Sequence, residues 1–138
     1  MTTFNKVDGR EQISAWVKYG LNKESIDYAE EFGKWLQENQ LTTTQIRNIY
    51  GEVKRIQMKD QSKTADAEIL LLRPKLAYAR ARGANTRSKD ALKSFSEVMG
   101  EGINAVFDGD TDSKFERFEN FALFFESVIA YHRASGGK

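Results

Sequence analysis

Residues 115–133, FERFENFALFFESVIAYHR, decide the fold class. Apolar side chains recur in this stretch every three or four residues, which is the spacing of one face of an α-helix. The stripe consists of Phe115, Phe118, Phe121, Ala122, Phe125 and Ile129. So many aromatic rings on one face predict a helix that forms a main wall of a hydrophobic core.

Helical spacing also recurs along the rest of the chain, and no segment shows the sustained alternation of a strand. Further stripes predict helices at Ile13, Trp16, Val17 and Gly20; at Ile26, Ala29, Phe32, Gly33 and Leu36; at Ile46, Ile49, Tyr50, Val53 and Ile56; and at Leu92, Phe95, Met99, Ile103 and Val106. Tyr28 and Trp35 fall on the far side of the second of these helices. At 138 residues the chain can form one core, so we expect a single all-α domain, a compact bundle of five or six helices.

Two cap signals mark where helices begin. Thr42 is followed three residues later by Gln45, which is the signature of a capping box. Ser88 follows a loop and is predicted to cap the next helix.

The only proline, Pro74, lies in LLLRPKLAYARARG, residues 70–83. Apolar positions stay in phase on both sides of it: Ile69, Leu72, Leu76, Ala79 and Gly83. The continuous phase predicts one helix, from about residue 64 to residue 83, with a kink at Pro74. Because proline costs about 3 kcal/mol in a helix interior, the alternative is that Pro74 opens a new helix.

The chain has no cysteine, which excludes disulfides and thiolate metal sites. Its first residues lack the cationic-then-apolar order of a secretory signal. The longest apolar runs, ILLL and FALFF, are much shorter than a bilayer span. We therefore expect a cytoplasmic protein with no membrane partner.

The net charge of +1 hides an uneven distribution. Residues 45–93 carry 12 Lys or Arg and 5 Asp or Glu, whereas the remainder carries 9 basic and 15 acidic residues. The chain thus has basic central helices, about residues 42–93, between acidic N- and C-terminal helices. A basic middle indicates a face for a polyanion, although solvated lysine-rich helix faces give the same pattern.

Basic side chains border the apolar stripe of the proline-containing helix. On a helical wheel Arg73 and Arg80 lie along one edge, and the other edge carries Lys75 and Arg82 with Tyr78 beside them. The preceding helix and the following loop add Arg47, Lys54, Arg55 and Arg87. Arginines one or two turns apart span about 5 to 10 Å, a distance comparable with that between phosphates of a strand. The pattern predicts contacts with a nucleic-acid backbone; the alternative is that these cations pair with acidic groups of the protein.

The segment DGDTDSKFERFE, residues 108–119, matches a calcium-binding loop in part. Asp108, Asp110, Asp112 and Glu119 occupy its positions 1, 3, 5 and 12, but Ser113 replaces the glycine that the sharp turn requires. An acidic linker whose aspartates cap the next helix explains the same residues, so calcium binding stays open.

The sequence offers little for catalysis. Its only histidine, His132, has no second histidine or cysteine beside it and is predicted to act as a cation in the last turn of its helix. GEGINAVFDGD is neither a dinucleotide fingerprint nor a phosphate loop. We expect no catalytic residue, no metal ligand and no cofactor.

Two segments together resemble the small helical subunit of type III-A CRISPR effector (Csm) complexes. TTTQIRNIYGEVKRI carries Gln45, Arg47, Tyr50 and Val53, and LLLRPKLAYARARG carries Leu72, Arg73, Pro74, Lys75 and Tyr78. The aromatic C-terminal helix completes the likeness, which extends from about residue 32 to residue 133.

The resemblance implies a non-catalytic subunit of a ribonucleoprotein in antiviral defence. Several copies would stack along the guide RNA and the target RNA, beside the other subunits of the type III-A effector complex. Their phosphate contacts would be independent of sequence and would come from Arg47, Lys54, Arg55, Arg73, Lys75, Tyr78, Arg80, Arg82 and Arg87. Tyr50 is expected to be half-buried packing rather than a ligand contact.

A second interpretation is a helical protein–protein adaptor without direct nucleic-acid contact. The cations would then meet acidic partners, and the unexplained aromatic residues Trp35, Tyr28 and Phe124 would form a docking patch.

Overall fold

A computed structural model describes residues 10–58, 66–82 and 85–136. All regular secondary structure in these ranges is helical, in the order α1 (Arg10–Tyr19), α2 (Lys23–Glu38), α3 (Thr43–Gln57), α4 (Asp66–Ala81), α5 (Thr86–Val106) and α6 (Lys114–Ala134). The all-α bundle predicted from the sequence is confirmed.

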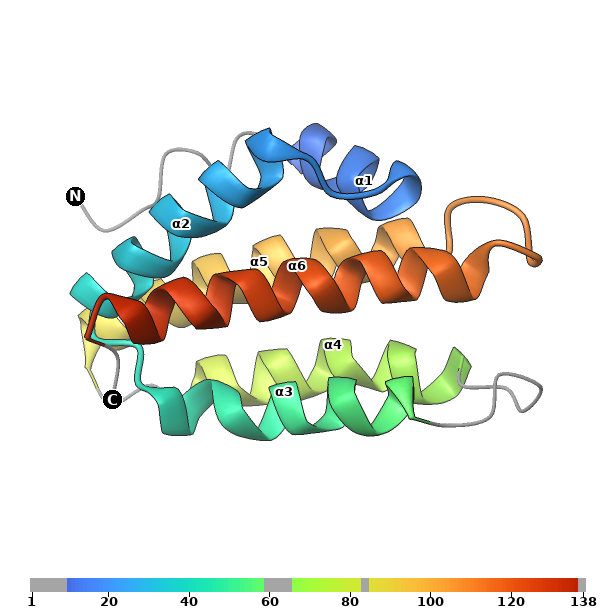
Figure 1. The fold of residues 1–138 in the computed structure, drawn as a ribbon. Helices are drawn as coiled ribbons and strands as arrows, with labels where there is room; N and C mark the ends of the chain where they lie inside the picture. Colours follow the sequence, from blue (N-terminus) through green and yellow to red (C-terminus); the bar gives the residue numbers. More distant parts are fainter. Residues whose placement is uncertain (1–9, 59–65, 83–84, 137–138) are drawn as a thin grey trace.

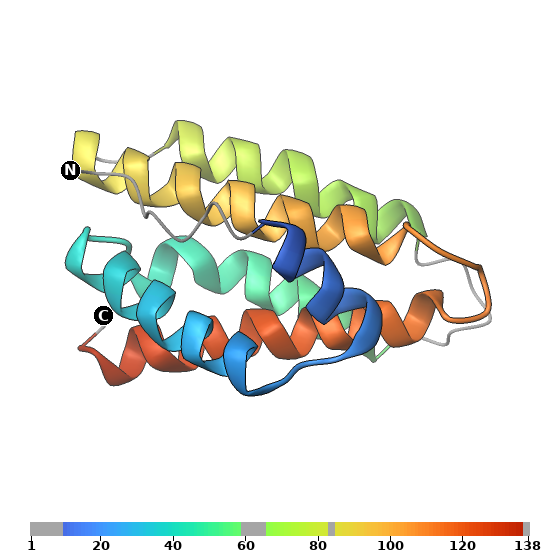
Figure 2. The same cartoon turned by 90° about the horizontal axis from the view of Figure 1, so that it is seen from above.

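The six helices form three layers (Figure 1). The long helices α5 and α6 lie side by side in the middle, with α1 and α2 on one side and α3 and α4 on the other. Seen from above, α1 crosses over α5 and α6 at an angle, and α2 also lies obliquely across α6 (Figure 2). The middle layer therefore buries two faces, and each outer layer keeps one face in solvent.

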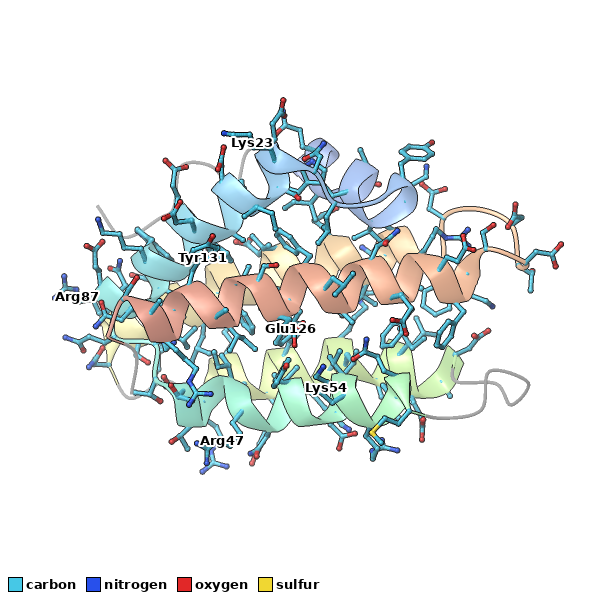
Figure 3. All side chains as sticks on the ribbon, viewed as in Figure 1. Lys23, Arg47, Lys54, Arg87, Glu126 and Tyr131 are labelled. Atoms are coloured by element: carbon cyan, nitrogen blue, oxygen red, sulfur yellow. The ribbon has the colours of Figure 1, made fainter. Side chains whose placement is uncertain are left out.

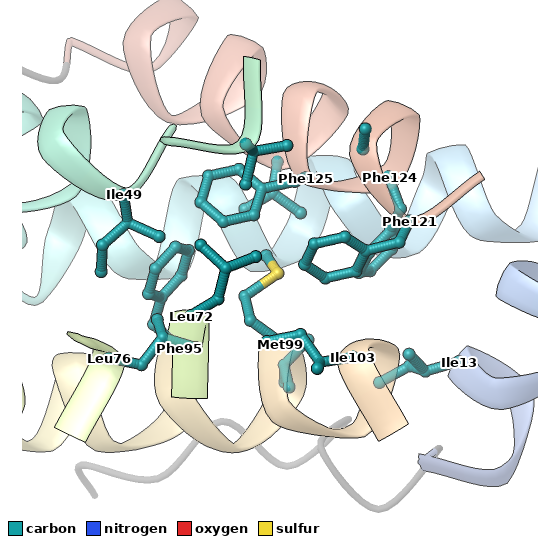
Figure 4. Close-up of a cluster of buried hydrophobic side chains, with 14 of the residues drawn as sticks. Ile13, Ile49, Leu72, Leu76, Phe95, Met99, Ile103, Phe121, Phe124 and Phe125 are labelled. Atoms are coloured by element: carbon teal, nitrogen blue, oxygen red, sulfur yellow. The ribbon is translucent and has the colours of Figure 1, made fainter. Parts of the chain in front are cut away.

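The core lies around α5 and α6 and contains most of the predicted apolar stripes (Figure 4). The prediction was wrong for Ile26 and Phe115, which are only half-buried and lie outside the core. Phe125 packs edge-on against Phe95 with ring centres 5.4 Å apart, and Phe121 packs against Phe125 at 5.9 Å. Leu72 and Leu76 of α4 reach the same cluster, which anchors the outer helix.

The helix starts follow cap chemistry, with one correction. The predicted capping box of α3 is confirmed, since the Thr42 hydroxyl accepts from the Gln45 amide and the Gln45 side chain accepts from the Thr42 amide. For α5 the prediction was wrong, because Asn85 is the cap and its Oδ1 accepts from the Ser88 amide at 2.8 Å. Ser88 lies inside the first turn, where its buried hydroxyl accepts from Gln45 Nε2 at 2.9 Å and ties α5 to α3.

α4 runs from Asp66 to Ala81 without interruption and contains Pro74. One helix through the proline is confirmed, and the alternative of a new helix at Pro74 is wrong. Pro74 lies on the exposed side of α4, whereas Ile69, Leu72 and Leu76 are buried. The predicted end positions at residues 64 and 83 lie outside the described residues.

The predicted docking patch of Trp35, Tyr28 and Phe124 does not exist as a surface. Tyr28 is 5% exposed and Phe124 is 1% exposed, because α1 lies across them and places Trp16 against both rings. Trp35 is half-buried and stacks on Phe32 with an interplanar angle of 14°. The prediction was wrong because a wheel of α2 or α6 alone does not show the helix that covers it.

α2 and α6 are in close contact at Gly33. A Cβ atom at this position would lie 2.7 Å from the Val128 carbonyl oxygen and 2.8 Å from the His132 amide nitrogen. Only a residue without a side chain allows the two backbones to approach this far.

No helix in the described ranges is long and apolar enough to cross a membrane.

Candidate nucleic-acid interface

The sequence-predicted contact residues, apart from Arg87, belong to the layer formed by α3 and α4 and the residue that follows it, Arg82. Arg47 projects from α3 away from the core, and Arg87 lies at the far end of the molecule in the first turn of α5 (Figure 3). The structure therefore brings eight of the nine predicted residues to one layer, and the ninth, Arg87, belongs to the central helix α5.

The two edges predicted for α4 are confirmed by what each edge faces. Arg73 lines a hollow of about 560 Å³ between α4 and α5 that also contains Glu97 and Glu101. Arg80 lines a neighbouring hollow of about 420 Å³ that also contains Lys89, Asp90 and Lys93. Lys75 and Arg82 line a groove on the opposite side, between α4 and α3.

We call this the α3/α4 groove; its volume is about 670 Å³. Its apolar lining comes from Ile49, Leu71, Pro74 and Ala79, and its polar lining from Thr44, Gln45, Asn48, Glu52, Lys75, Tyr78 and Arg82. An apolar cleft with a few charged groups at its rim is the usual form of a ligand site.

Three of the predicted cations pair with carboxylates of the protein. Lys54 lies 3.4 Å from Glu126 of α6, and the hydrogen bond to that carboxylate raises the pKa of Lys54. Both side chains are labelled in Figure 3. Arg55 lies 2.5 Å from Glu52 and 3.3 Å from Glu68, and Lys75 lies 3.3 Å from Glu52. The hydrogen bond from Arg55, followed by that from Lys75, lowers the pKa of Glu52, so this carboxylate stays ionised.

The remaining arginines of the predicted set are freer. Within the part of the chain that the structure describes, no ion pair joins Arg47, Arg73, Arg80, Arg82 or Arg87 to a carboxylate, and all five are exposed. They are therefore the cations best placed to meet a phosphate without first breaking a pair.

The sequence analysis did not identify the carboxylates that pair with Lys54, Arg55 and Lys75. The Glu52/Arg55 pair is three residues apart on one helix and was visible in the sequence. The Lys54–Glu126 pair joins two helices, so only the packing of α3 on α6 reveals it.

The two tyrosines of this layer differ in burial. Tyr50 stacks on Phe125 with ring centres 5.9 Å apart and donates to Glu126 Oε1 at 3.0 Å, which confirms that it is half-buried packing. Burial, with the Glu126 hydrogen bond, raises the pKa of Tyr50. Tyr78 is 64% exposed, and its hydroxyl accepts a hydrogen bond from Arg82 Nη1 at 3.3 Å.

The acidic loop before α6 is organised around Arg117. This buried guanidinium donates from Nε to the Val106 carbonyl at 2.8 Å and from Nη2 to the Asp110 carbonyl at 2.6 Å. Two carboxylates of the suspected calcium loop turn to other partners, since Asp108 binds Lys18 at 3.1 Å and Glu119 accepts from Gln57 at 3.3 Å.

Asp110 also acts locally, because its Oδ1 accepts from the Ser113 amide at 2.8 Å, just before α6. Across the described ranges, no group of three or more His, Cys, Asp or Glu residues is placed to hold a metal ion. The geometry favours the interpretation of residues 108–119 as an acidic linker that leads into α6.

His132 is in the last turn of α6, but the prediction that it acts there as a cation was wrong. The side chain is fully buried, and burial lowers its pKa. Its Nε2 meets the Leu41 carbonyl oxygen, and its Nδ1 has no hydrogen-bond partner among the described residues. A buried ring with one carbonyl acceptor and no carboxylate is a neutral, structural histidine.

Comparison with known families supplies the identity that the geometry alone does not. The sequence model of the Csm2 Type III-A family matches residues 21–138. The chain belongs to the Csm2 family. No curated protein matches the sequence, and no solved structure matches it either.

Membership of the Csm2 family makes this chain a small subunit of a type III-A CRISPR complex, which contains other subunits. All nine predicted contact residues lie inside the matched range. Helix α1 lies outside it, yet α1 supplies Ile13, Trp16 and Val17 to the core. The Csm2 match therefore covers the candidate interface completely and the hydrophobic core only in part.

Proposed function

We propose that this Csm2 protein binds the phosphate backbone of the guide and target RNA through its α3/α4 layer, without regard to sequence and without catalysis. The observation that carries the proposal is the pair Arg73 and Arg80 on α4. Both are exposed, and neither forms an ion pair with a carboxylate within the described ranges, although Glu97 and Glu101 line the hollow of Arg73 and Asp90 lines that of Arg80. Seven residues of helix separate them by about 10 Å along the axis, which suits alternate phosphates of an extended strand.

The charge of the layers supports the same proposal. Helices α3 and α4 carry six Lys or Arg and three Asp or Glu, whereas α1 and α2 carry four basic and six acidic residues. The basic and the acidic layers lie on opposite sides of α5 and α6 (Figure 1). Copies stacked in one direction along an RNA would bring an acidic face towards a basic face, so we propose that the copies self-associate in this way.

The proposal is tested by RNA binding across a salt series, with single-stranded RNA and the subunit in its assembled complex. Each phosphate neutralised on a single strand contributes about −0.7 to the slope of log affinity against log salt. We expect Arg73→Ala and Arg80→Ala to weaken binding of every RNA sequence and to flatten that slope.

Two further variants sharpen the test. Lys75→Ala is expected to have a smaller effect, since Lys75 already shares Glu52 with Arg55. Lys34→Ala is the control, because Lys34 is an exposed cation on α2 in the opposite layer. If Arg73→Ala, Arg80→Ala and Lys34→Ala bind alike, the basic layer is a solvated surface and the adaptor interpretation replaces this one.

A further inference from the structure

The phosphate contacts leave the α3/α4 groove unexplained. Its mouth carries Tyr78, whose 64% exposure is large for an aromatic side chain, and Leu71, which is 51% exposed. Burial of such apolar surface by a ligand is favourable, so a groove of this composition is poised to bind something less polar than phosphate.

Arg82 fixes the orientation of the Tyr78 ring. Its Nη1 donates to the Tyr78 hydroxyl at 3.3 Å, and its guanidinium carbon lies 5.5 Å from the ring centre. The guanidinium lies on one side of the ring, near its hydroxyl end, and a ligand would stack on the other side. A held ring loses little side-chain freedom on binding, which favours stacking of a flat group on it.

The interior of the groove suits a flat, polar-edged heterocycle. Its volume of about 670 Å³ exceeds that of one base, and Ile49, Pro74 and Ala79 provide apolar surface for the face of a ring. The Asn48 side chain on the same wall has no hydrogen-bond partner among the described residues and offers both a donor and an acceptor to a base edge.

The charges at the rim favour a nucleotide over an apolar side chain. Lys75 and Arg82 both line the groove, so cations lie beside the apolar surface. Lys75 already meets Glu52, which lines the same groove, whereas Arg82 forms no ion pair within the described ranges. A base in the groove would place its own phosphate next to Arg82, whereas a leucine or phenylalanine of a protein partner would leave that cation without a counterpart.

We propose that the α3/α4 groove seats one unpaired nucleobase of the bound RNA, stacked on the free face of Tyr78. This inference rests on the proposed RNA-binding function and adds a contact that phosphate neutralisation does not supply. Because every base has a π-face, stacking of this kind tolerates all four bases and remains compatible with binding that ignores sequence.

The test compares two single-stranded RNAs, an oligo(A) and the same sugar–phosphate chain without bases, on the full-length protein and on its assembled complex. Wild-type protein should bind oligo(A) about tenfold more tightly than the abasic chain, within the range measured for stacking on an aromatic side chain. Tyr78→Ala should abolish this ratio, because it weakens binding of oligo(A) about tenfold more than binding of the abasic chain. Tyr78→Phe keeps the ring and should retain most of the ratio.

Tyr19→Ala is the matched control. Tyr19 is an exposed tyrosine with a cation, Lys18, 5.7 Å from its ring centre, but it lies on α1 in the opposite layer. This variant should bind both RNAs as the wild type does.

The outcomes separate this inference from the function on which it rests. If Tyr78→Ala weakens both RNAs equally, or neither, no base is seated on Tyr78 and the inference is wrong. If the wild-type protein shows no salt-dependent binding of the abasic chain, the phosphate proposal itself fails. If Tyr78→Ala changes sedimentation of the assembled complex and not the ratio, the groove binds protein, which also overturns the inference.

Discussion

Replacement of Gly33 by alanine tests how closely the acidic layer packs on the central layer. The added Cβ would lie 2.7 Å from the Val128 carbonyl oxygen and 2.8 Å from the His132 amide nitrogen. These two atoms are four residues apart on α6, so they belong to one rung of its backbone hydrogen bonding. Backbone atoms of a packed helix cannot rotate away, so α2 itself must move.

The expected loss of stability is the difference between two effects. Alanine stabilises a helix by about 0.8 to 1.0 kcal/mol relative to glycine. Over-packing of a well-filled interior costs about 1 to 3 kcal/mol, and contact with backbone places Gly33→Ala at the upper end. We expect a net loss of about 1 to 2 kcal/mol in the free energy of unfolding.

Gly51→Ala and Gly100→Ala are matched controls for this measurement. Both glycines lie inside helices, α3 and α5, and an added Cβ would meet nothing within 4 Å at either position. These variants should gain about 0.5 to 1 kcal/mol from helix propensity. Because the same propensity gain applies at Gly33, the difference between variants isolates the steric cost.

The assay is urea unfolding of the full-length chain, followed by circular dichroism at 222 nm and analysed for both midpoint and slope. An unchanged slope with a lower midpoint for Gly33→Ala would assign the loss to the folded state. If Gly33→Ala is as stable as Gly51→Ala, then α2 and α6 do not approach as described, and the reasoning is refuted.

Three further predictions concern single side chains. Protonation of buried His132 favours the unfolded chain, because burial lowers the pKa of this side chain in the folded state. The free energy of unfolding should therefore fall as the pH drops below about 6.5, by up to about 1.4 kcal/mol per pH unit. A pH series on His132→Gln should lack this component. Arg117→Met leaves the Val106 and Asp110 carbonyls without their donor, so urea unfolding should show a loss of about 2 to 4 kcal/mol; a loss below 1 kcal/mol would contradict this. Pro74→Ala restores a helix hydrogen bond and should raise stability by up to about 3 kcal/mol, yet weaken RNA binding if the proline aims the cations of α4; unchanged values of both would remove any such role for Pro74.

The sequence contains enough to predict the outer helices well. In α3 and α4 one face is buried and the other is in solvent, so the apolar stripe and the cationic edges can be read from a wheel. Arg73 and Lys75 lie on opposite edges of α4 in the structure, as the wheel predicts.

Prediction fails for residues whose surroundings come from a distant segment. α6 lies in the middle layer and is buried on more than one face. Phe124 is therefore as much a core residue as Phe125, although it does not belong to the apolar stripe that the sequence predicts for this helix. Tyr28 is covered by Trp16, which belongs to another helix. Pairwise contacts such as Lys54 with Glu126 arise only from tertiary packing, which a one-dimensional pattern does not contain.

The position of the two tryptophans has a practical consequence. Trp16 and Trp35 both belong to the layer of α1 and α2, whereas Tyr78 and the proposed RNA contacts lie on the far side of the central helices. Intrinsic tryptophan emission therefore reports on the N-terminal helices and is remote from the α3/α4 groove. Red-shifted emission would signal that α1 has come away from Tyr28 and Phe124. The emission wavelength would therefore show whether a variant or an assembly step loosens the layer of α1 and α2.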